Sequence, residues 1–387
     1  MNLNKLKKSS NRTFAVFIRN DTRFMEIYKR FLKLDLLKQL STFNTKKYDS
    51  QDYFKVLEHA SLHNISITQT CDLKRALGER CPSAEQVLKC CRNNSSTTMI
   101  NFMNNALFYQ FNALPKTLQQ HLKKSGIVFI DFHQDPYYGD KENPDVKKAN
   151  VKASTTFFYE YLTADLYSGK GSFTIAITHR SPHEKIDVLV KRLLAHIEKV
   201  LSPRIIIFDG EFSSVAVLAE LTRKKIKFLA RKSRSSRIKA HLTSHYSKPD
   251  WENFRTWHPI ELRSWRSRIK TVYVDVCPQN VKGEMKALIK SPGWAITPRY
   301  ADKLYGKRFN IESGYRDKHK FQSFTTTKAL SSRLLYILFA ALLWNCWQAL
   351  LIWVKTLKSY SKKLPRSLLI TLTSTWIKIL LNKALHS

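Results

Sequence analysis

A single acidic residue stands among cations in the run YGKRFNIESGYRDKHK, residues 305–320. Tyr305, Arg308 and Glu312 are separated by three and four positions, so on an α-helix they would share one face, which Arg316 extends. A carboxylate in this setting can hold a divalent metal ion while its cationic neighbours hold a polyanion, as phosphodiester chemistry requires. The alternative is the solvated charged face of an ordinary helix.

The composition favours an anionic partner. Lys plus Arg outnumber Asp plus Glu by 66 to 30 in 387 residues, which gives a net charge of +36. Nucleic acid is therefore the first partner to expect and an anionic membrane the second. Hydrophobic residues make up 43% of the chain, with 22 Phe and 16 Tyr, enough for real cores and too much for a disordered tail.

The six cysteines show no CxxC pair, and no secretory signal precedes them. This pattern predicts reduced thiols in a cytoplasmic protein. Four of them lie near His59 and His63, so a zinc site stays open beside the simpler interpretation of buried thiols. The cysteines are Cys71, Cys81, Cys90, Cys91, Cys277 and Cys346.

Residues 1–122 are predicted to form a helical N-terminal DNA-binding domain that begins with a basic arm over residues 1–20. FMEIYKRFLKLDLLKQL and YFKVLEHASL repeat apolar residues at helical spacing. LKRALGERC and PSAEQVLKCC indicate two short helices joined by a turn. These two helices fit a helix-turn-helix, and they fit a small helical bundle equally.

Residues 123–231 alternate between predicted strands and helices. IVFIDF is a buried strand ending at Asp131, and STTFFYEYLTADLYS and SFTIAITHR form a hairpin around a glycine turn. A helix in HEKIDVLVKRLLAHIEKVL leads to the strand RIIIFD, which ends at Asp209, and then SSVAVLAELTRKK is helix and IKFLAR strand. The chain therefore reads strand, strand, strand, helix, strand, helix, strand.

That order predicts an α/β fold with a ribonuclease H-like core, a mixed five-stranded sheet with flanking helices. In this fold the first and fourth strands are neighbours, so Asp131 and Asp209 would meet at one edge, and the helix with Glu312 would return there. His133, Asp135 and Asp140 are rival ligands, but we expect them in the loop after the strand that Asp131 ends.

Residues 232–300 are predicted to be a β-rich basic insertion, with strand-like runs such as TVYVDV and WAITPR. Arginines, lysines and tryptophans alternate here, which suits a surface that holds phosphates and stacks an unpaired base. The tryptophans could instead fill the insertion's own core. They are Trp251, Trp257, Trp265 and Trp294.

Residues 301–387 are expected to complete the core with the glutamate helix and C-terminal helices. Leu334 to Val354 is a run of 21 uncharged residues, long enough to cross a bilayer. Asn345 and Gln348 lie inside it and no second such run follows, which favours a helix buried in a soluble core. SLLITLTSTWIKILLNKAL is predicted as a final helix over that core.

Residues 126–350 resemble the DDE transposases of the insertion-sequence-4 type, in particular the archaeal branch with the halobacterial insertion sequences. The resemblance rests on IIIFDGEFSS and on Tyr305, Arg308 and Glu312 within YxxRxxxE. The family signature continues with a lysine at the position where this chain has His319, so Lys318 or Lys320 would take that role. Members of this family commonly have the sequence DREF after the fourth strand, where this chain has DGEF.

The resemblance implies a metal-dependent enzyme that cuts DNA at the ends of an element and transfers the strands to target DNA, often through hairpin ends. Asp131, Asp209 and Glu312 would hold two Mg²⁺ or Mn²⁺ ions. The terminal phosphates would be held by Tyr305, Arg308, Arg316 and Lys318 or Lys320.

The expected partners are double-stranded DNA, as inverted-repeat ends and as target, and a second copy of the chain. The expected location is the prokaryotic cytoplasm at the nucleoid, without a membrane. Three alternatives remain. They are a catalytically silent DNA-binding protein of the same fold, a structure-specific nuclease of that fold, and a basic membrane-associated protein.

Overall fold

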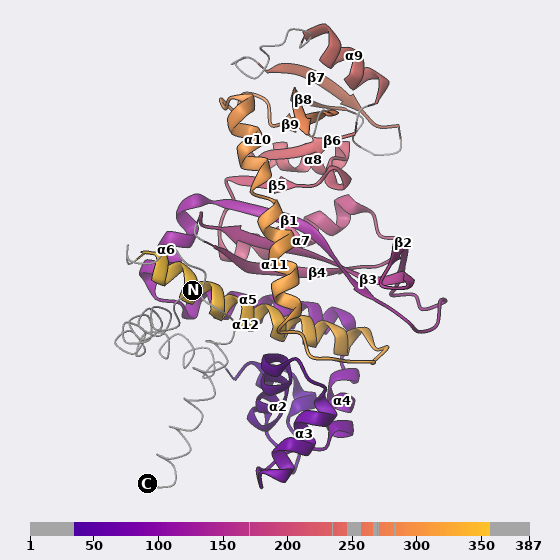
Figure 1. Ribbon diagram of the computed structural model, residues 1–387, viewed down its shortest axis with the longest axis vertical. Helices are drawn as coiled ribbons and strands as arrows, with labels where there is room; N and C mark the ends of the chain where they lie inside the picture. The colour runs from indigo at the N-terminus through magenta and orange to yellow at the C-terminus, as the bar shows by residue number, and fades with distance from the viewer. Residues whose placement is uncertain are drawn as a thin grey trace, which may run out of the picture.

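The computed structural model describes residues 35–356, apart from 170, 234, 246–256, 266–268, 270 and 282–283. Nine strands form one sheet (Figure 1), in the order β2-β3-β1-β5-β6-β9-β8-β7 with β4 also paired to β3. The predicted basic arm, the final C-terminal helix and Trp251 lie outside the described residues. The strands are β1 (Ile127–Pro136), β2 (Lys147–Lys152), β3 (Thr155–Tyr167), β4 (Ser172–Arg180), β5 (Ile205–Phe208), β6 (Lys227–Lys232), β7 (His258–Arg263), β8 (Thr271–Val281) and β9 (Glu284–Lys290).

Five of these strands form the ribonuclease H-like core, in the spatial order β4-β3-β1-β5-β6. β3 pairs antiparallel with β1 and β4, whereas β1, β5 and β6 run parallel. Parallel strands need crossover connections, which α7 (Ile186–Val200) and α8 (Val215–Arg223) provide. The predicted mixed α/β class is confirmed, and so is the hairpin of β3 and β4.

Strand β1 is longer than predicted. It continues past Asp131 to Pro136, and this second half pairs with β3 down to the Pro136–Phe158 pair. The parallel partner β5 stops at Phe208, opposite Ile130. The prediction that the strand ends at Asp131 was therefore wrong, although Asp131 does lie where the parallel pairing ends.

The insertion continues the central sheet, because β9 pairs antiparallel with β6. β7 and β8 extend the sheet beyond β9, and α9 (Ser236–His245) lies beside β8. The predicted strand in WAITPR was wrong. Residues 291–297 form a loop, and Pro298 starts α10 (Pro298–Gly306) with Thr297 as its N-cap, since proline's fixed φ suits the first helical turn.

The N-terminal helices share an apolar core with the C-terminal helix α12 (Leu330–Thr356). α5 and α12 pack against each other and both contact β4, so this region is built onto the ribonuclease H-like core. Asp49 and Ser66 start α2 and α3 with capping boxes, and all six cysteines are buried. The helices are η1 (Leu36–Gln39), η2 (Ser41–Phe43), α2 (Ser50–His63), α3 (Ile67–Ala76), α4 (Ala84–Arg92), α5 (Ser96–Ala113) and α6 (Lys116–Ser125).

Helix α12 is mostly apolar, and protein covers it from Leu330 to Ala349. Among the described helices, it alone is long and apolar enough to cross a membrane, and its segment Leu330–Ala349 is entirely buried. Asn345, fully buried, donates hydrogen bonds to Gln110 and to the Thr174 carbonyl, and accepts one from the Thr174 amide. A polar side chain satisfied in this way is typical of a protein core.

Replacing Asn345 by leucine tests whether α12 is a core helix. Leucine would leave the Thr174 amide and carbonyl and the Gln110 oxygen buried without Asn345, so we expect the free energy of unfolding to fall by about 2–3 kcal/mol. Urea denaturation of the purified protein measures this. Leu343→Met, a substitution of similar volume at another fully buried site on α12, should cost less than about 1.5 kcal/mol. Equal stability of the two variants would contradict the core assignment.

Candidate active site

The two aspartates lie side by side at one edge of the core. Ile130 of β1 is paired with Phe208 of β5, so Asp131 and Asp209 are the next residues on adjacent parallel strands. The Asp131 side chain is 14% exposed. Asp209 caps the short helix η3 (Gly210–Phe212) by accepting a 2.6 Å hydrogen bond from the Gly210 amide. The predicted meeting of these two acids is thus seen in the fold.

Two side chains from the YxxRxxxE segment contact these acids. Arg308 Nη1 lies 2.7 Å from Asp131 Oδ2, and Arg308 is only 5% exposed. Tyr305 donates a 3.4 Å hydrogen bond to Asp209 Oδ1, and burial raises the pKa of Tyr305 to about 12. Its ring also lies 5.2 Å from the Arg231 guanidinium. The segment therefore returns to the sheet edge, as predicted.

The segment forms two helices rather than one. α10 ends at Gly306, and α11 (Phe309–His319) begins after Lys307 and Arg308, whose backbones both stay in the right-handed helical region. Glycine is a poor helix former, which accounts for a break at this point. The prediction of one continuous helix was wrong. Because the two residues between α10 and α11 keep helical backbone angles, Glu312 still follows Arg308 by one helical turn.

Tyr315 attaches α11 to the edge of the sheet. Its hydroxyl donates a 3.0 Å hydrogen bond to the carbonyl of Asp131 and shares a 2.6 Å hydrogen bond with Thr163 Oγ1. Burial and the nearby carboxylates Asp131 and Asp165 raise the pKa of Tyr315 well above its ordinary value. Asp131 is thus held from its backbone as well as from its carboxylate.

The two candidate lysines have different surroundings. Lys318 is 8% exposed, and its ammonium lies 2.8 Å from Oδ2 and 2.9 Å from Oδ1 of Asp165. Lys320 is exposed and forms a 2.7 Å ion pair with Asp317. Arg316 is exposed as well. Lys320 and Arg316 are therefore accessible to an incoming phosphate, whereas Lys318 faces the sheet.

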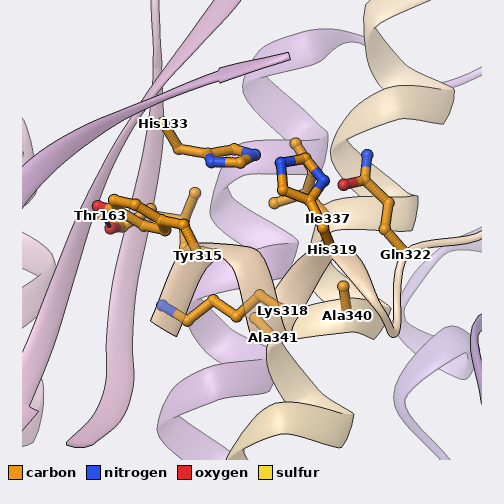
Figure 2. Close-up of a pocket in the computed structure, with 10 residues that line it drawn as sticks. His133, Thr163, Tyr315, Lys318, His319, Gln322, Ile337, Ala340 and Ala341 are labelled. Atoms are coloured by element: carbon orange, nitrogen blue, oxygen red, sulfur yellow. Dashed lines mark hydrogen bonds between the residues drawn. The ribbon is translucent and has the colours of Figure 1, made fainter. Parts of the chain in front are cut away.

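Asp135, Asp140 and His133 were the alternatives to Asp131 as a metal ligand. Asp135 is 5% exposed and forms a 2.8 Å ion pair with Arg333, and Asp140 lies in the loop after β1. His133 lines a cavity of about 20 Å³ together with Tyr315, Lys318 and His319. Figure 2 shows the His133 ring next to the ring of His319. Burial, with the charges of His319 and Lys318, lowers the pKa of His133 well below its ordinary value.

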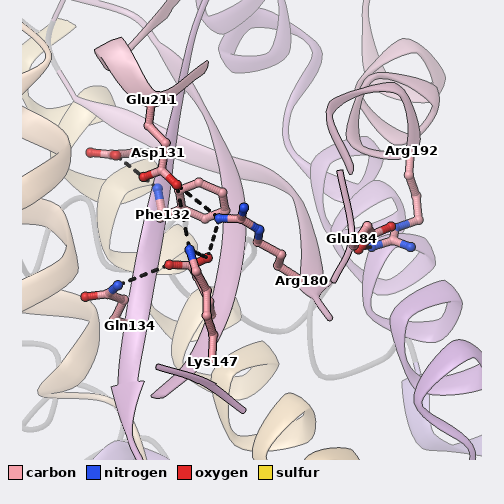
Figure 3. Close-up of polar contacts among 9 residues, drawn as sticks. Asp131, Phe132, Gln134, Lys147, Arg180, Glu184, Arg192 and Glu211 are labelled. Atoms are coloured by element: carbon pink, nitrogen blue, oxygen red, sulfur yellow. Dashed lines mark hydrogen bonds and ion pairs between the residues drawn. The ribbon is translucent and has the colours of Figure 1, made fainter. Parts of the chain in front are cut away.

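A network of ion pairs beside the aspartates was not predicted. Arg180 Nη1 lies 2.8 Å from the buried Glu160 and 3.0 Å from Glu211, two residues after Asp209, and Lys147 lies 3.1 Å from Glu160 (Figure 3). Each carboxylate has a cation, so the network holds η3 against β3 and β4. The available signal was Glu160 itself, one of two acidic residues in a largely apolar strand.

Asp131 and Asp209 are suited to bind a hard divalent metal ion. Both offer oxygen ligands, which Mg²⁺ and Mn²⁺ prefer, and Asp131 already binds a cation, the Arg308 guanidinium. The side chain of Glu312 lies outside what the structure describes. Among the described residues, no group of three or more His, Cys, Asp or Glu is arranged to hold a metal ion.

Comparison with known proteins supports the fold. No protein-family model and no curated protein matches this sequence. The solved piggyBac transposase, in its synaptic complex with hairpin DNA, is similar at a TM-score of 0.57 and 14% identity, covering 92% of this chain and 81% of that chain. An Argonaute from Marinitoga piezophila with guide RNA and target DNA covers 66% of this chain and 34% of that chain at 10% identity and a TM-score of 0.21, too low to carry an argument. The chain therefore shares the fold of the piggyBac transposase.

Proposed function

We propose that this chain is a DDE transposase of the insertion-sequence-4 type, which cuts double-stranded DNA at the inverted-repeat ends of its element and joins the ends to target DNA. One observation carries the proposal. Arg308, four residues before Glu312, reaches Asp131 at the edge that Asp131 and Asp209 share. The fold shared with the piggyBac transposase and the net charge of +36 support the same function.

Asp131, Asp209 and Glu312 are the residues that would hold two Mg²⁺ or Mn²⁺ ions in this proposal. Metal ions held there would make a water molecule or a DNA 3′-hydroxyl a better nucleophile and would stabilise the charge on the leaving oxygen. The chain's own side chains do the rest. Tyr305 orients Asp209 through its hydroxyl, and Tyr315 fixes the backbone of Asp131.

Two exposed cations, one in α11 and one at its C-cap, would hold the DNA beside the acids. Arg316 and Lys320 are accessible there, and an arginine can hold one phosphate with two hydrogen bonds. Arg308 joins them when its guanidinium leaves Asp131 for a phosphate. Cutting two element ends in one complex requires two active sites, so we propose a homodimer that acts on DNA in the prokaryotic cytoplasm.

Cleavage of the element's own ends tests this function. The purified chain is incubated with a DNA fragment that carries the inverted repeats flanking its gene, with Mg²⁺ or with a chelator. We expect cuts at the repeat ends in Mg²⁺ only, and joining of the cut ends to an added plasmid. A fragment with scrambled repeats is the control. Folded protein that binds the ends and never cuts them would favour a catalytically silent DNA-binding protein, and cutting without joining would favour a nuclease.

Trp265 is the most exposed of the described tryptophans of the insertion, so we propose that it stacks an unpaired base. It is 86% exposed, whereas Trp294 is buried and Trp257 donates a hydrogen bond to the Ile296 carbonyl. Stacking on one base is worth about 1–3 kcal/mol. We therefore expect Trp265→Ala to slow hairpin formation at element ends by about 5–150-fold, measured on pre-nicked ends. Trp265→Phe, which keeps an aromatic face, should retain most of the rate, and equal rates in all three proteins would contradict the assignment.

A further inference from the structure

The ion pair between Lys318 and Asp165 is buried between α11 and β3. Asp165 is fully buried, and its carboxylate accepts hydrogen bonds from Lys318 at 2.8 and 2.9 Å and from Thr174 Oγ1 at 2.7 Å. Figure 2 shows the Lys318 side chain extending from α11 towards the strands. A buried charge is tolerated when it is paired and hydrogen-bonded, and such a pair accepts little change in geometry.

Polar contacts attach α11 to the sheet at two levels. Asp165 and Thr163 are two residues apart on β3 and so point to the same face. Lys318 binds Asp165, and Tyr315, one turn earlier in α11, binds Thr163. Phe309, at the start of the helix, is 50% exposed. Two directional contacts one turn apart fix the rotation of α11 and its height on the sheet.

The same two contacts lie close to the candidate acids. Tyr315 also donates to the Asp131 carbonyl, and Thr163 is paired with Asp131 across β1 and β3. Glu312 precedes Tyr315 by three residues on α11. Any rotation of α11 would therefore move Glu312 relative to Asp131. A misplacement of about 1 Å can cost a reaction about 100-fold in rate.

We infer that Lys318 and Asp165 are positioning residues, which fix α11 on β3 and with it the position of Glu312 along the helix relative to Asp131 and Asp209. This rests on the proposed function for its effect on cleavage, whereas the anchoring itself does not. Lys318 then has no phosphate to hold. The lysine role of the family signature falls to Lys320, whose exposed ammonium can leave Asp317 for a DNA phosphate.

The test uses the double variant Asp165→Asn/Lys318→Met. Either single substitution leaves one buried charge without its partner and can prevent folding. The double variant removes both charges and keeps side chains of similar size. Its matched control is Asp275→Asn/Lys290→Met, the same exchange at a buried pair in β8 and β9, where Lys290 lies 2.5 Å from Asp275.

Three measurements on the folded full chain decide the inference. Amide hydrogen exchange over residues 309–319 should be about tenfold faster in the test variant and unchanged in the control. Cleavage of element ends should be about 100-fold slower in the test variant. Its affinity for those ends, and the salt dependence of that affinity, should match the wild type, because no phosphate contact is lost.

Two results would overturn the inference. Wild-type exchange over residues 309–319 in the test variant would show that the pair does not anchor α11, whether or not the chain cuts DNA. Weaker binding of element ends, with the slope of log affinity against log salt concentration reduced by about one, would show that Lys318 contacts a DNA phosphate. A wild-type chain that cuts no DNA would instead contradict the proposed function, and the exchange measurement would still decide the anchoring.

Discussion

Replacing Asp209 by asparagine is expected to reduce metal-dependent cleavage of element ends by about 1,000-fold or more, since a metal-bound site supplies several kcal/mol to the transition state. Binding of the same ends should stay close to that of the wild type, because Asp209 is placed as a metal ligand and contacts no DNA in the proposal. Asparagine keeps the shape of the side chain and one oxygen, so Gly210 and Tyr305 keep an acceptor. Cleavage under single-turnover conditions and end binding in the same buffer measure the two effects.

The control for this prediction is the same substitution at a rival acid. Asp140→Asn, in the loop after β1, should cut DNA at the wild-type rate. Glu312→Gln should behave as Asp209→Asn does, if α11 delivers the third acid. Full activity of Asp209→Asn, or loss of end binding by the folded variant, would remove Asp209 from the metal-binding set.

The positions of the two aspartates could be predicted because buried parallel strands are continuous apolar runs. IVFI and IIIF both read in this way, and each is followed by an aspartate. The continuation of β1 could not be read, because HQDP is polar and β3, its partner there, lies elsewhere in the chain. The buried positions in the second half of β1 are the polar residues His133 and Asp135, so this half shows no apolar alternation.

The surroundings of the YxxRxxxE segment could be predicted only in part. The spacing of Tyr305 and Arg308 predicted that their side chains lie on one face of a helix and reach the same site. Both side chains do contact the aspartates. Spacing could not separate Lys318 from Lys320, because the difference lies in Asp165, a residue 153 positions away in β3. The charge of Asp165 inside an apolar strand was the available signal, and it required a partner that only the fold supplies.

Replacing Arg308 by alanine is expected to lower the free energy of unfolding by about 3–5 kcal/mol in metal-free buffer, because it leaves the partly buried Asp131 carboxylate without its guanidinium. Lys303→Ala, which removes an exposed cation from the neighbouring helix α10, should change it by less than about 0.5 kcal/mol. Urea denaturation with a chelator present measures both. Equal stability of the two variants would show that the ion pair contributes nothing.

Adding Mg²⁺ to the Arg308→Ala protein separates the two roles of this arginine. A divalent ion at Asp131 must displace the guanidinium in the wild type and meets no such competitor in the variant, so the ion should stabilise the variant more than the wild type. At one hundred times its dissociation constant for the variant, the ion should stabilise the variant by about 2.7 kcal/mol. With the ion bound, Arg308 of the wild type is released to hold a phosphate. End binding by Arg308→Ala in Mg²⁺ should therefore be weaker by about 1–3 kcal/mol, the range for a charge-assisted hydrogen bond. Wild-type affinity in Mg²⁺ would confine Arg308 to its structural pairing with Asp131.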